Sequence, residues 1–256
     1  MFLAAAVYYV ARDPLRYRWH RRRFERIIGL EQRFKNHVAS SFPYYNRLSA
    51  QHKIEFERRL QYVISTKDFY TFDGLDLTAE IMALSAASAV QLTFGYKHFW
   101  LPNVKAILVY PNSFQRYHGW PKFRGEYSER GYIRLSWHHF QHGYLEPRDG
   151  VNLGLHEMAH ALMHLHELRM SFDEFNGDEL LYDKLASLEM LRVRNNENGF
   201  LRGYAGTNKD EMFAVCVEYF FEVPDLFQTE LPELYEAMSR LLNQDPARSH
   251  EPVWVR

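Results

Sequence analysis

The residues whose types and spacing could do chemistry lie in one short stretch, His156-Glu157-Met158-Ala159-His160. Residues four apart lie above one another on one helix face, so His156 and His160 can point two imidazoles at one metal ion. Two histidines at this spacing form half of a zinc site, and Glu157 stands where it could activate a water molecule. The stretch therefore predicts a zinc centre with a general base beside it.

The surroundings of this stretch favour a buried metal site over an accidental match. The chain has 13 histidines and 32 acidic residues, so a small share of such sequences would contain the pattern by chance. Apolar residues lie around the motif on several helix faces, and buried imidazoles or carboxylates are costly without a partner. These apolar residues are Leu153, Leu155, Met158, Ala159, Leu162 and Met163. A metal ion is the simplest partner.

The helix that carries the motif is expected over about residues 150–168, with Asp149 as its N-cap. His164 continues the four-residue row after His160. A third histidine one turn further along would be too far from an ion held between His156 and His160. His164 is therefore expected to support the site or to face solvent.

A catalytic zinc usually takes three protein ligands, so a third ligand must come from elsewhere in the chain. A predicted helix over residues 209–222 offers acidic candidates, which are Asp210, Glu211, Glu218 and Glu222. Glu211 and Glu218 are seven residues apart and share a helix face, so spacing does not decide which of them is the third zinc ligand. Glu211 also fits a capping box behind Asn208, which would be a purely local role.

Several further motifs follow this pattern in a recognisable order. They are residues 155–162, 203–205, 210–215 and 218–221, preceded by Phe42-Pro43, Leu48-Ser49, Val109-Tyr110-Pro111 and Leu135-Ser136-Trp137. Together they resemble the Mlc titration factor A family of zinc peptidases over roughly residues 30 to 230. The paired helix motifs carry most of this resemblance.

The resemblance implies a site and a function. It implies that Glu211 completes a zinc site with His156 and His160, with one zinc ion per chain, and that Tyr204 assists Glu157 in catalysis. It implies a zincin-type catalytic domain similar to that of anthrax lethal factor. Members of the family are described as aminopeptidase-like, and the founding member binds the glucose repressor Mlc. The expected partners are therefore peptide or protein substrates and a regulatory protein.

The composition indicates a folded, nearly neutral protein. The 256 residues are 16% aromatic and carry a net charge of −1, which fits one folded domain and gives no case for nucleic acid as a partner. The only cysteine, Cys216, excludes an internal disulfide and a cysteine-rich zinc site, and it is expected to be a buried core residue. This cysteine usage fits a reducing compartment, and a cytoplasmic location is expected.

The N-terminal residues 1–30 are expected to form a separate segment ahead of a peptidase domain at residues 31–256. Residues 1–10 are apolar, and seven arginines follow between residues 12 and 26. Ten apolar residues are too few to span a bilayer, which needs about 20, and no charged region precedes them as in a signal peptide. One expectation is that the segment is the end of a membrane anchor, with membrane contact through residues 1–26 and the arginines on the cytoplasmic side. Docking on the domain is slightly favoured.

The remaining pattern indicates an α+β fold, mostly helical with a small sheet and preceded by N-terminal helices. Helices are expected over residues 21–38, 49–64, 79–94, 178–194, 209–222 and 232–242, and strands over residues 106–110 and 132–137. Residues 112–130 are expected to form a long loop or an irregular hairpin. The strand that ends at Ser136-Trp137 is expected either to be a sheet edge that pairs with an extended substrate or to be a plain core strand.

These inferences predict a zinc-dependent, aminopeptidase-like peptidase. Glu157 would take the proton of the attacking water and pass it to the leaving amine, and Tyr204 would hydrogen-bond the oxyanion. The main alternative is a zincin-fold regulatory protein that sequesters a transcriptional regulator and has weak or vestigial peptidase activity. A non-peptidase zinc hydrolase would use the same ligands.

Overall fold

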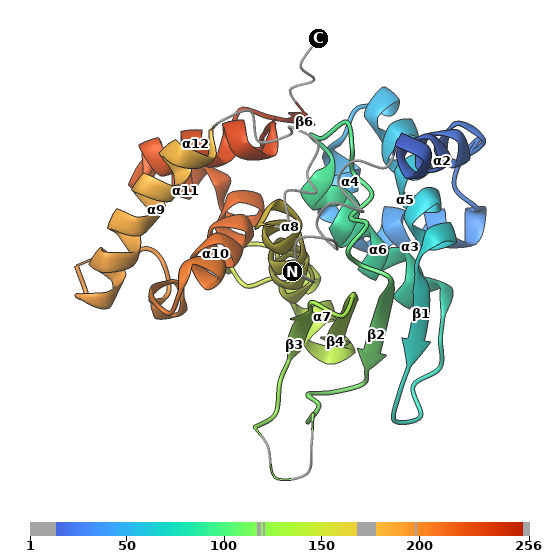
Figure 1. Cartoon of the computed structure of the whole chain (residues 1–256), viewed down its shortest axis with the longest axis horizontal. Helices are drawn as coiled ribbons and strands as arrows, with labels where there is room; N and C mark the ends of the chain where they lie inside the picture. Colours follow the sequence, from blue (N-terminus) through green and yellow to red (C-terminus); the bar gives the residue numbers. More distant parts are fainter. Residues whose placement is uncertain (1–13, 117–118, 120, 168–177, 198, 253–256) are drawn as a thin grey trace.

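The computed structural model describes residues 14–116, 119, 121–167, 178–197 and 199–252 (Figure 1). The N-terminal half holds α2 (Pro14–Glu25), α3 (Gln32–Ser41), α4 (Pro43–Arg47), α5 (Ala50–Thr66) and α6 (Ala79–Thr93), with strands β1 (Asp68–Thr71), β2 (Ala106–Tyr110), β3 (Gly125–Ser128) and β4 (Tyr132–Ser136). The C-terminal half holds α7 (Trp137–Leu145), α8 (Leu153–Glu167), α9 (Glu179–Arg194), the 3-10 turn η1 (Gly203–Gly206), α10 (Lys209–Glu222), α11 (Pro224–Glu230), α12 (Pro232–Leu242), β5 (Gln244–Asp245) and β6 (Ser249–Pro252). The prediction of a mostly helical α+β fold with a small sheet is confirmed.

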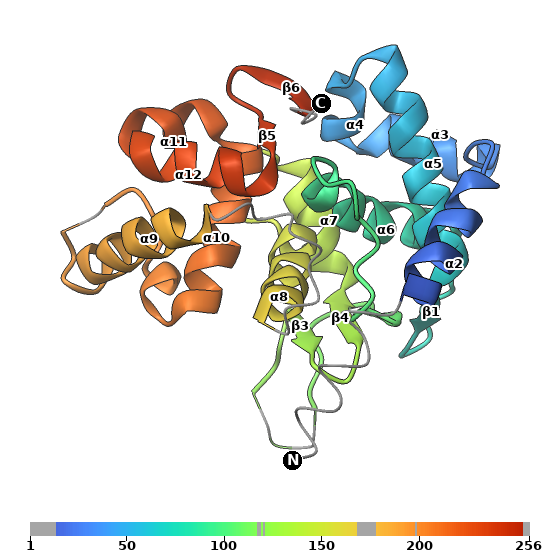
Figure 2. The same ribbon diagram turned by 45° about the horizontal axis from the view of Figure 1, so that its top comes forward.

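Helix α8 lies between two groups of elements. Figure 1 and Figure 2 both show the sheet and the N-terminal helices on one side of α8 and helices α9–α12 on the other. Helix α8 packs against α10 on one side and against α6, β3 and β4 on the other. The histidine motif therefore lies where the two groups meet.

The four-stranded sheet has the order β1-β2-β4-β3, so β3 is an edge strand. Strands β1, β2 and β4 are parallel, whereas β3 runs antiparallel to β4. Of the two expectations for the strand ending at Ser136-Trp137, the sheet edge is therefore wrong, and the core strand is confirmed, because β4 lies between β2 and β3. Part of the predicted loop over residues 112–130 pairs with it as β3, and Trp137 already belongs to α7.

Small residues allow helices α6 and α8 to approach closely. Ala83, Ala86 and Ala87 of α6 are fully buried. A Cβ atom added at Gly154 of α8 would lie 2.5 Å from Oγ of Ser88, so the contact tolerates no larger residue without a shift. This packing fixes the beginning of α8, which carries the motif, against the core.

The predicted helix over residues 21–38 is wrong, because the structure contains two helices there. Helix α2 ends at Glu25, and α3 begins at Gln32 after an extended Glu31 with φ −59° and ψ 139°. Gly29 lies in the break between them, where its conformational freedom disfavours a continuous helix. The Phe24 ring of α2 packs edge-on against Tyr62, with 6.0 Å between ring centroids.

This contact docks α2 on α5. The described part of the N-terminal segment therefore packs on the domain, which was the favoured of the two expectations. Residues 1–13 lie outside the described residues, so the division at residue 30 and the membrane anchor stay predictions. Within the part of the chain that the structure describes, no helix is both long and apolar enough to cross a bilayer.

The other predicted elements are confirmed near their expected bounds. Ser49 and Thr78 cap α5 and α6 through their side chains, as helix-start residues should. Cys216 is fully buried in α10, as predicted. The pattern missed β1 and α7, both of which are short, and the helices α4 and α11, each of which begins at a proline.

Candidate active site

The loop before α8 sets the position of the histidine motif. The structure contradicts Asp149 as N-cap, since the helix begins only at Leu153. Gly150 has a positive φ of 71°, and Asp149 accepts a hydrogen bond from the Val151 N–H at 2.9 Å, so these residues form a turn. Oδ1 of Asn152 accepts from the Leu155 N–H at 3.0 Å and takes the capping role instead.

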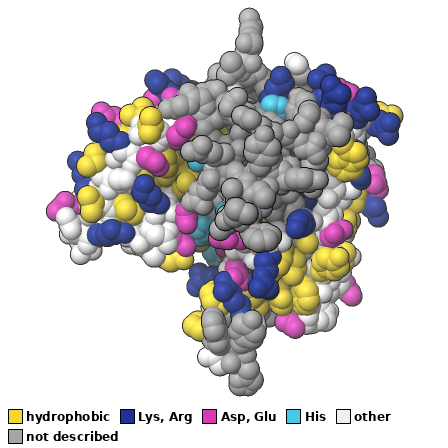
Figure 3. Space-filling model, in the orientation of Figure 1, with side chains coloured by type: hydrophobic (Ala, Val, Ile, Leu, Met, Phe, Trp, Pro, Cys, Tyr) yellow, Lys and Arg dark blue, Asp and Glu magenta, His cyan; other side chains and the backbone are white. Residues whose placement is uncertain are grey.

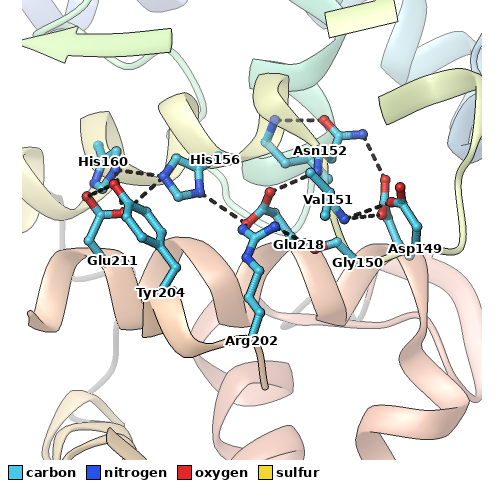
Figure 4. Close-up of polar contacts among 12 residues, drawn as sticks. Asp149, Gly150, Val151, Asn152, His156, His160, Arg202, Tyr204, Glu211 and Glu218 are labelled. Carbon is cyan, nitrogen blue, oxygen red and sulfur yellow. Dashed lines mark hydrogen bonds and ion pairs between the residues drawn. The ribbon is translucent and has the colours of Figure 1, made fainter. Parts of the chain in front are cut away.

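His156, His160 and Glu211 converge at one point between α8 and α10 (Figure 4). Nε2 of His156 lies 3.1 Å from Nε2 of His160 and 3.1 Å from Oε2 of Glu211. Nε2 of His160 lies 3.5 Å from the same carboxylate oxygen. Two histidines of one helix turn and a glutamate 51 positions after His160 thus present one ligand atom each to a shared point.

The donor set fits a metal cation. Nδ1 of His156 faces the Glu218 carboxylate at 3.0 Å, and a carboxylate that also accepts from Arg202 must receive the imidazole proton. Nε2 of His156 therefore presents a lone pair to Glu211, whose buried Oε2 has no hydrogen-bond partner among the described residues. Lone pairs held this close repel one another unless a cation lies among them. Two histidines and one glutamate are a typical ligand set of catalytic zinc.

Glu211 is oriented by the first turn of α10. Its backbone N–H donates to Oδ1 of the N-cap Asn208 at 2.9 Å, while its carboxylate turns to the imidazoles. Burial alone would raise the pKa of Glu211, but hydrogen bonds from His156 and His160 and their positive charges, when these imidazoles are protonated, outweigh it and hold the pKa well below its ordinary value. Among the described residues, the capping box expected as the alternative role is only half formed.

Glu218 contacts the opposite side of the same histidine. Oε2 faces Nδ1 of His156, and Oε1 accepts from the Asn152 N–H at 2.8 Å. Arg202 donates to the same carboxylate, as Figure 4 shows. Glu218 therefore orients the His156 ring, and spacing alone could not separate this role from that of a ligand.

Glu157 is buried, with 5% of its surface exposed, and lies against the edge strand. A Cβ atom at Gly125 of β3 would stand 2.3 Å from Oε1 of Glu157, so a larger residue would force this carboxylate or the strand to shift. Burial raises the pKa of Glu157, although the charges of His156 and His160 partly offset this rise. A raised pKa makes the carboxylate a better proton acceptor. Glycine inside a strand was the one sequence signal for this close approach.

Tyr204 reaches the site from η1. Its hydroxyl donates to Oε1 of Glu211 at 3.1 Å, while 51% of the residue stays exposed. Burial, followed by the nearby Glu211 charge, raises the pKa of Tyr204 to about 12. The phenol therefore remains a hydrogen-bond donor at neutral pH.

His164 ties the motif helix to the edge strand. Its Nδ1 lies 2.6 Å from the Tyr127 hydroxyl of β3. Asn103 donates to that hydroxyl at 3.0 Å and to the Ala161 carbonyl of α8 at 2.7 Å. His164 thus lies beside the site without sharing the point at which His156, His160 and Glu211 meet.

Comparisons with known proteins agree with the motifs. The sequence model of the family described as glucose-regulated metallo-peptidase M90 matches residues 16–242. Mlc titration factor A of Yersinia pestis (strain Pestoides F) is 27% identical, with 72% of this chain and 74% of that protein covered. The protein of the same name from Yersinia pseudotuberculosis (serotype O:1b, strain IP 31758) matches with the same identity of 27% and the same coverage of 72% and 74%. The family resemblance inferred from the sequence is confirmed.

Proposed function

The chain belongs to the glucose-regulated metallo-peptidase M90 family, and we propose that it is a zinc-dependent, aminopeptidase-like peptidase with a zincin-like catalytic domain. One observation carries the proposal. His156, His160 and Glu211 present their ligand atoms within 4.8 Å of one another, directly beside the buried carboxylate of Glu157. Ligands and base thus lie in one pocket, which is the arrangement that hydrolysis requires.

Zinc would be held by Nε2 of His156, Nε2 of His160 and the Glu211 carboxylate. When bound, it supplies a Lewis acid that lowers the pKa of water and polarises a carbonyl. Glu218 and Arg202 hold the His156 ring with its lone pair toward this point. A peptidase needs this fixed orientation because a loose ligand weakens the metal site.

Glu157 is the proposed general base, and Tyr204 the proposed oxyanion donor. Glu157 accepts the proton of the attacking water and returns it to the leaving amine. Tyr204 offers a neutral phenol at the rim of the pocket, where it can donate to the oxygen that gains charge. Because Tyr204 is half exposed, its hydroxyl has room to leave Glu211 and donate its hydrogen bond to the substrate instead.

Strand β3 is the proposed docking edge for an extended peptide. The Arg124 carbonyl accepts from the Ser136 N–H, so Arg124 directs its backbone groups toward β4. Backbone groups alternate along an antiparallel strand, and those of Gly125 and Tyr127 therefore face away from β4. A substrate could form backbone hydrogen bonds with Gly125 and with the Tyr127 carbonyl, because the Tyr127 N–H already donates to the Glu157 carboxylate.

Incubation of the purified protein with a defined peptide mixture tests the function. We expect cleavage that is lost on treatment with a chelator and restored by zinc, with single N-terminal residues among the products. Intact peptides in every condition would contradict the proposal. A separate experiment, elemental analysis of Glu211→Ala, tests the ligand set, because this variant should lose the metal. Stoichiometric zinc in Glu211→Ala would make Glu218 the better candidate.

A second candidate function follows from the names of the relatives. As the alternative to a peptidase, we infer that this chain binds a transcriptional regulator, because its relatives are named as titration factors of Mlc. A pull-down with Glu157→Gln as bait, which would trap substrates and partners alike, tests this. A captured DNA-binding regulator together with failed peptide cleavage would favour the binding function.

Helix α2 is a proposed contact for an anionic membrane surface. Lys and Arg side chains gather over it in Figure 3, and Arg18, Arg22 and Arg26 are exposed beside Trp19, which is 51% exposed. Arginines with an exposed tryptophan suit an interface of anionic headgroups. Sedimentation with phosphatidylglycerol vesicles should deplete the protein from solution, whereas phosphatidylcholine vesicles should not.

The proposed location of the catalytic domain is the cytoplasm. Cys216 is the only cysteine of the chain, and this cysteine usage fits a reducing compartment.

A further inference from the structure

The cleft that contains Glu157 divides into two halves of different charge. One half has a volume of about 350 Å³ and includes Glu126, Glu129 and Asp210 in its lining. The other has a volume of about 830 Å³ and includes Lys122, Arg124, His138, His139 and His142 in its lining. We call these the acidic half and the basic half. Both reach His156 and Glu157, so both border the point of catalysis.

The cations of the basic half are available to a ligand. Lys122 and Arg124 are exposed, and no carboxylate among the described residues forms an ion pair with either. Arg202, the other cation lining this half, is already bound to Glu218. Three carboxylates also line the basic half. Glu218 is paired with Arg202, Asp149 accepts the Val151 N–H, and Glu157 is the buried base that both halves share.

Three histidines of α7 add hydrogen-bond donors beside these cations. His138 and His142 are exposed, and Nδ1 of His139 lies 2.8 Å from the Ser136 hydroxyl. Their imidazoles offer N–H donors to an anion in either protonation state. The basic half therefore combines point charges at its rim with neutral donors on its wall.

The acidic half is different in kind. Glu126 is neutralised there by ion pairs with Arg116 and Arg134. Glu129 and Asp210 remain exposed and form no ion pair with a described residue. An anionic substrate group is therefore disfavoured in this half and favoured in the other.

The direction of β3 relates these halves to the two ends of a peptide. The strand runs from Gly125 to Ser128, and residues 122–124 of the basic half precede it. Antiparallel pairing is slightly more stable per residue than parallel pairing. A peptide that pairs antiparallel with β3 brings its C-terminal side beside the beginning of the strand. Residues that follow the scissile bond therefore lie against the basic half.

We propose that the basic half binds a carboxylate on the C-terminal side of the scissile bond and thereby selects the substrate. The carboxylate belongs either to an Asp or Glu side chain in the first two positions after the bond or to the free C-terminus of a short peptide. Lys122 and Arg124 act as the specificity-determining residues. The inference rests on the proposed peptidase function.

Matched peptides test this assignment with the zinc-loaded protein. The peptides differ only in Glu, Gln or Lys after the scissile bond, and each is made with a free and an amidated C-terminus. We expect kcat/KM to be about fivefold to tenfold higher for Glu than for Lys. A difference between free and amidated peptides would identify the terminal carboxylate as the group bound, and a difference confined to Glu would identify the side chain.

Charge reversal links the preference to named residues. Lys122→Glu combined with Arg124→Glu should lose or invert the preference for Glu, and added salt should reduce it in the wild type. Lys184→Glu is the matched control, because Lys184 is exposed on α9 and lines neither half of the cleft. The inference would be overturned by a preference that survives the double reversal. It would also be overturned if the wild type cleaved Glu and Lys peptides equally and made no distinction between free and amidated C-termini.

A binding measurement separates this inference from the proposed function. Fluorescence anisotropy with Glu157→Gln reports peptide affinity without turnover. If no peptide is cleaved by the wild type but the variant binds the Glu peptide more tightly than the Lys peptide, the peptidase function fails and the charge selection stands. If peptides are cleaved without regard to charge, the function stands and the selection fails.

Discussion

The Glu218 carboxylate lies 3.0 Å from Nδ1 of His156, on the side of the ring that faces away from Glu211. The two glutamates that share one face of α10 thus contact the two nitrogens of one imidazole. Glu211 lies at the ligand atom, and Glu218 fixes the tautomer that leaves this atom unprotonated. A histidine held by such a carboxylate is a stronger and better oriented metal ligand.

Glu218→Gln should weaken zinc binding without removing it. The amide loses the charge that stabilises the imidazole N–H, and such changes typically cost about 10–100-fold in metal affinity. Competition with a chromophoric chelator measures the affinity. Glu230→Gln, a substitution at an exposed position of α11, is the control. Unchanged zinc affinity in folded Glu218→Gln would show that Glu218 does not position His156.

Gly125→Ala should impair turnover while zinc stays bound. The new Cβ would stand 2.3 Å from Oε1 of Glu157 and force the carboxylate or β3 to move. A displacement of about 1 Å in a catalytic group can lower the rate about 100-fold. Steady-state kinetics and metal content are compared with Gly29→Ala, where an added Cβ meets no atom within 4 Å. Equal kcat values in the two variants would argue against Glu157 as the base.

Tyr204→Phe should lower kcat by about 100-fold and change KM little, because an oxyanion donor acts mainly in the transition state. The hydroxyl now bonds Glu211, so the variant also reports whether this contact matters for zinc. Kinetics on a cleaved peptide, with metal content measured in parallel, separate the two effects. A variant with wild-type kcat would remove Tyr204 from the mechanism.

Glu222 should make the protein less stable as pH rises. Burial, with a contribution from Asp149, raises the pKa of Glu222 from 4.5 to about 8. The folded protein therefore keeps a proton that the unfolded chain releases, and this contribution to the free energy of unfolding is lost between about pH 4.5 and about pH 8. Glu222→Gln should remove a pH-dependent change on the order of 5 kcal/mol.

Denaturant unfolding of the metal-free protein across this pH range measures the effect. Glu230→Gln again serves as the control, because Glu230 is exposed. Parallel pH profiles of Glu222→Gln and the wild type would mean that Glu222 titrates normally in the folded state.

The histidine motif was predictable because its geometry is local. Positions 156, 157 and 160 share one helix, and helical spacing alone brings the two imidazoles together. The third ligand was not predictable on spacing, since Glu211 and Glu218 lie on one face of α10 and both contact His156. Only the tertiary packing of α8 on α10 decides which imidazole nitrogen each glutamate meets.

The edge strand β3 was the main feature that could not be predicted from the sequence. Strand β3 has four residues, all of intermediate burial, so it lacks the alternation of apolar and polar residues that reveals a strand. The break between α2 and α3 was similarly hidden, because charged and apolar residues continue across it. In both places, long-range contacts rather than local pattern decide the structure.

Parallel analysis of the wild type and Glu157→Gln tests the central claim most directly. Elemental analysis gives the zinc content of each protein, and chromogenic amino-acid anilides and the peptide mixture report turnover. The carboxylate is proposed as a base and not as a ligand, so both proteins should hold one zinc ion per chain while only the wild type turns over. Equal turnover by the two proteins, or zinc in neither, would contradict the account.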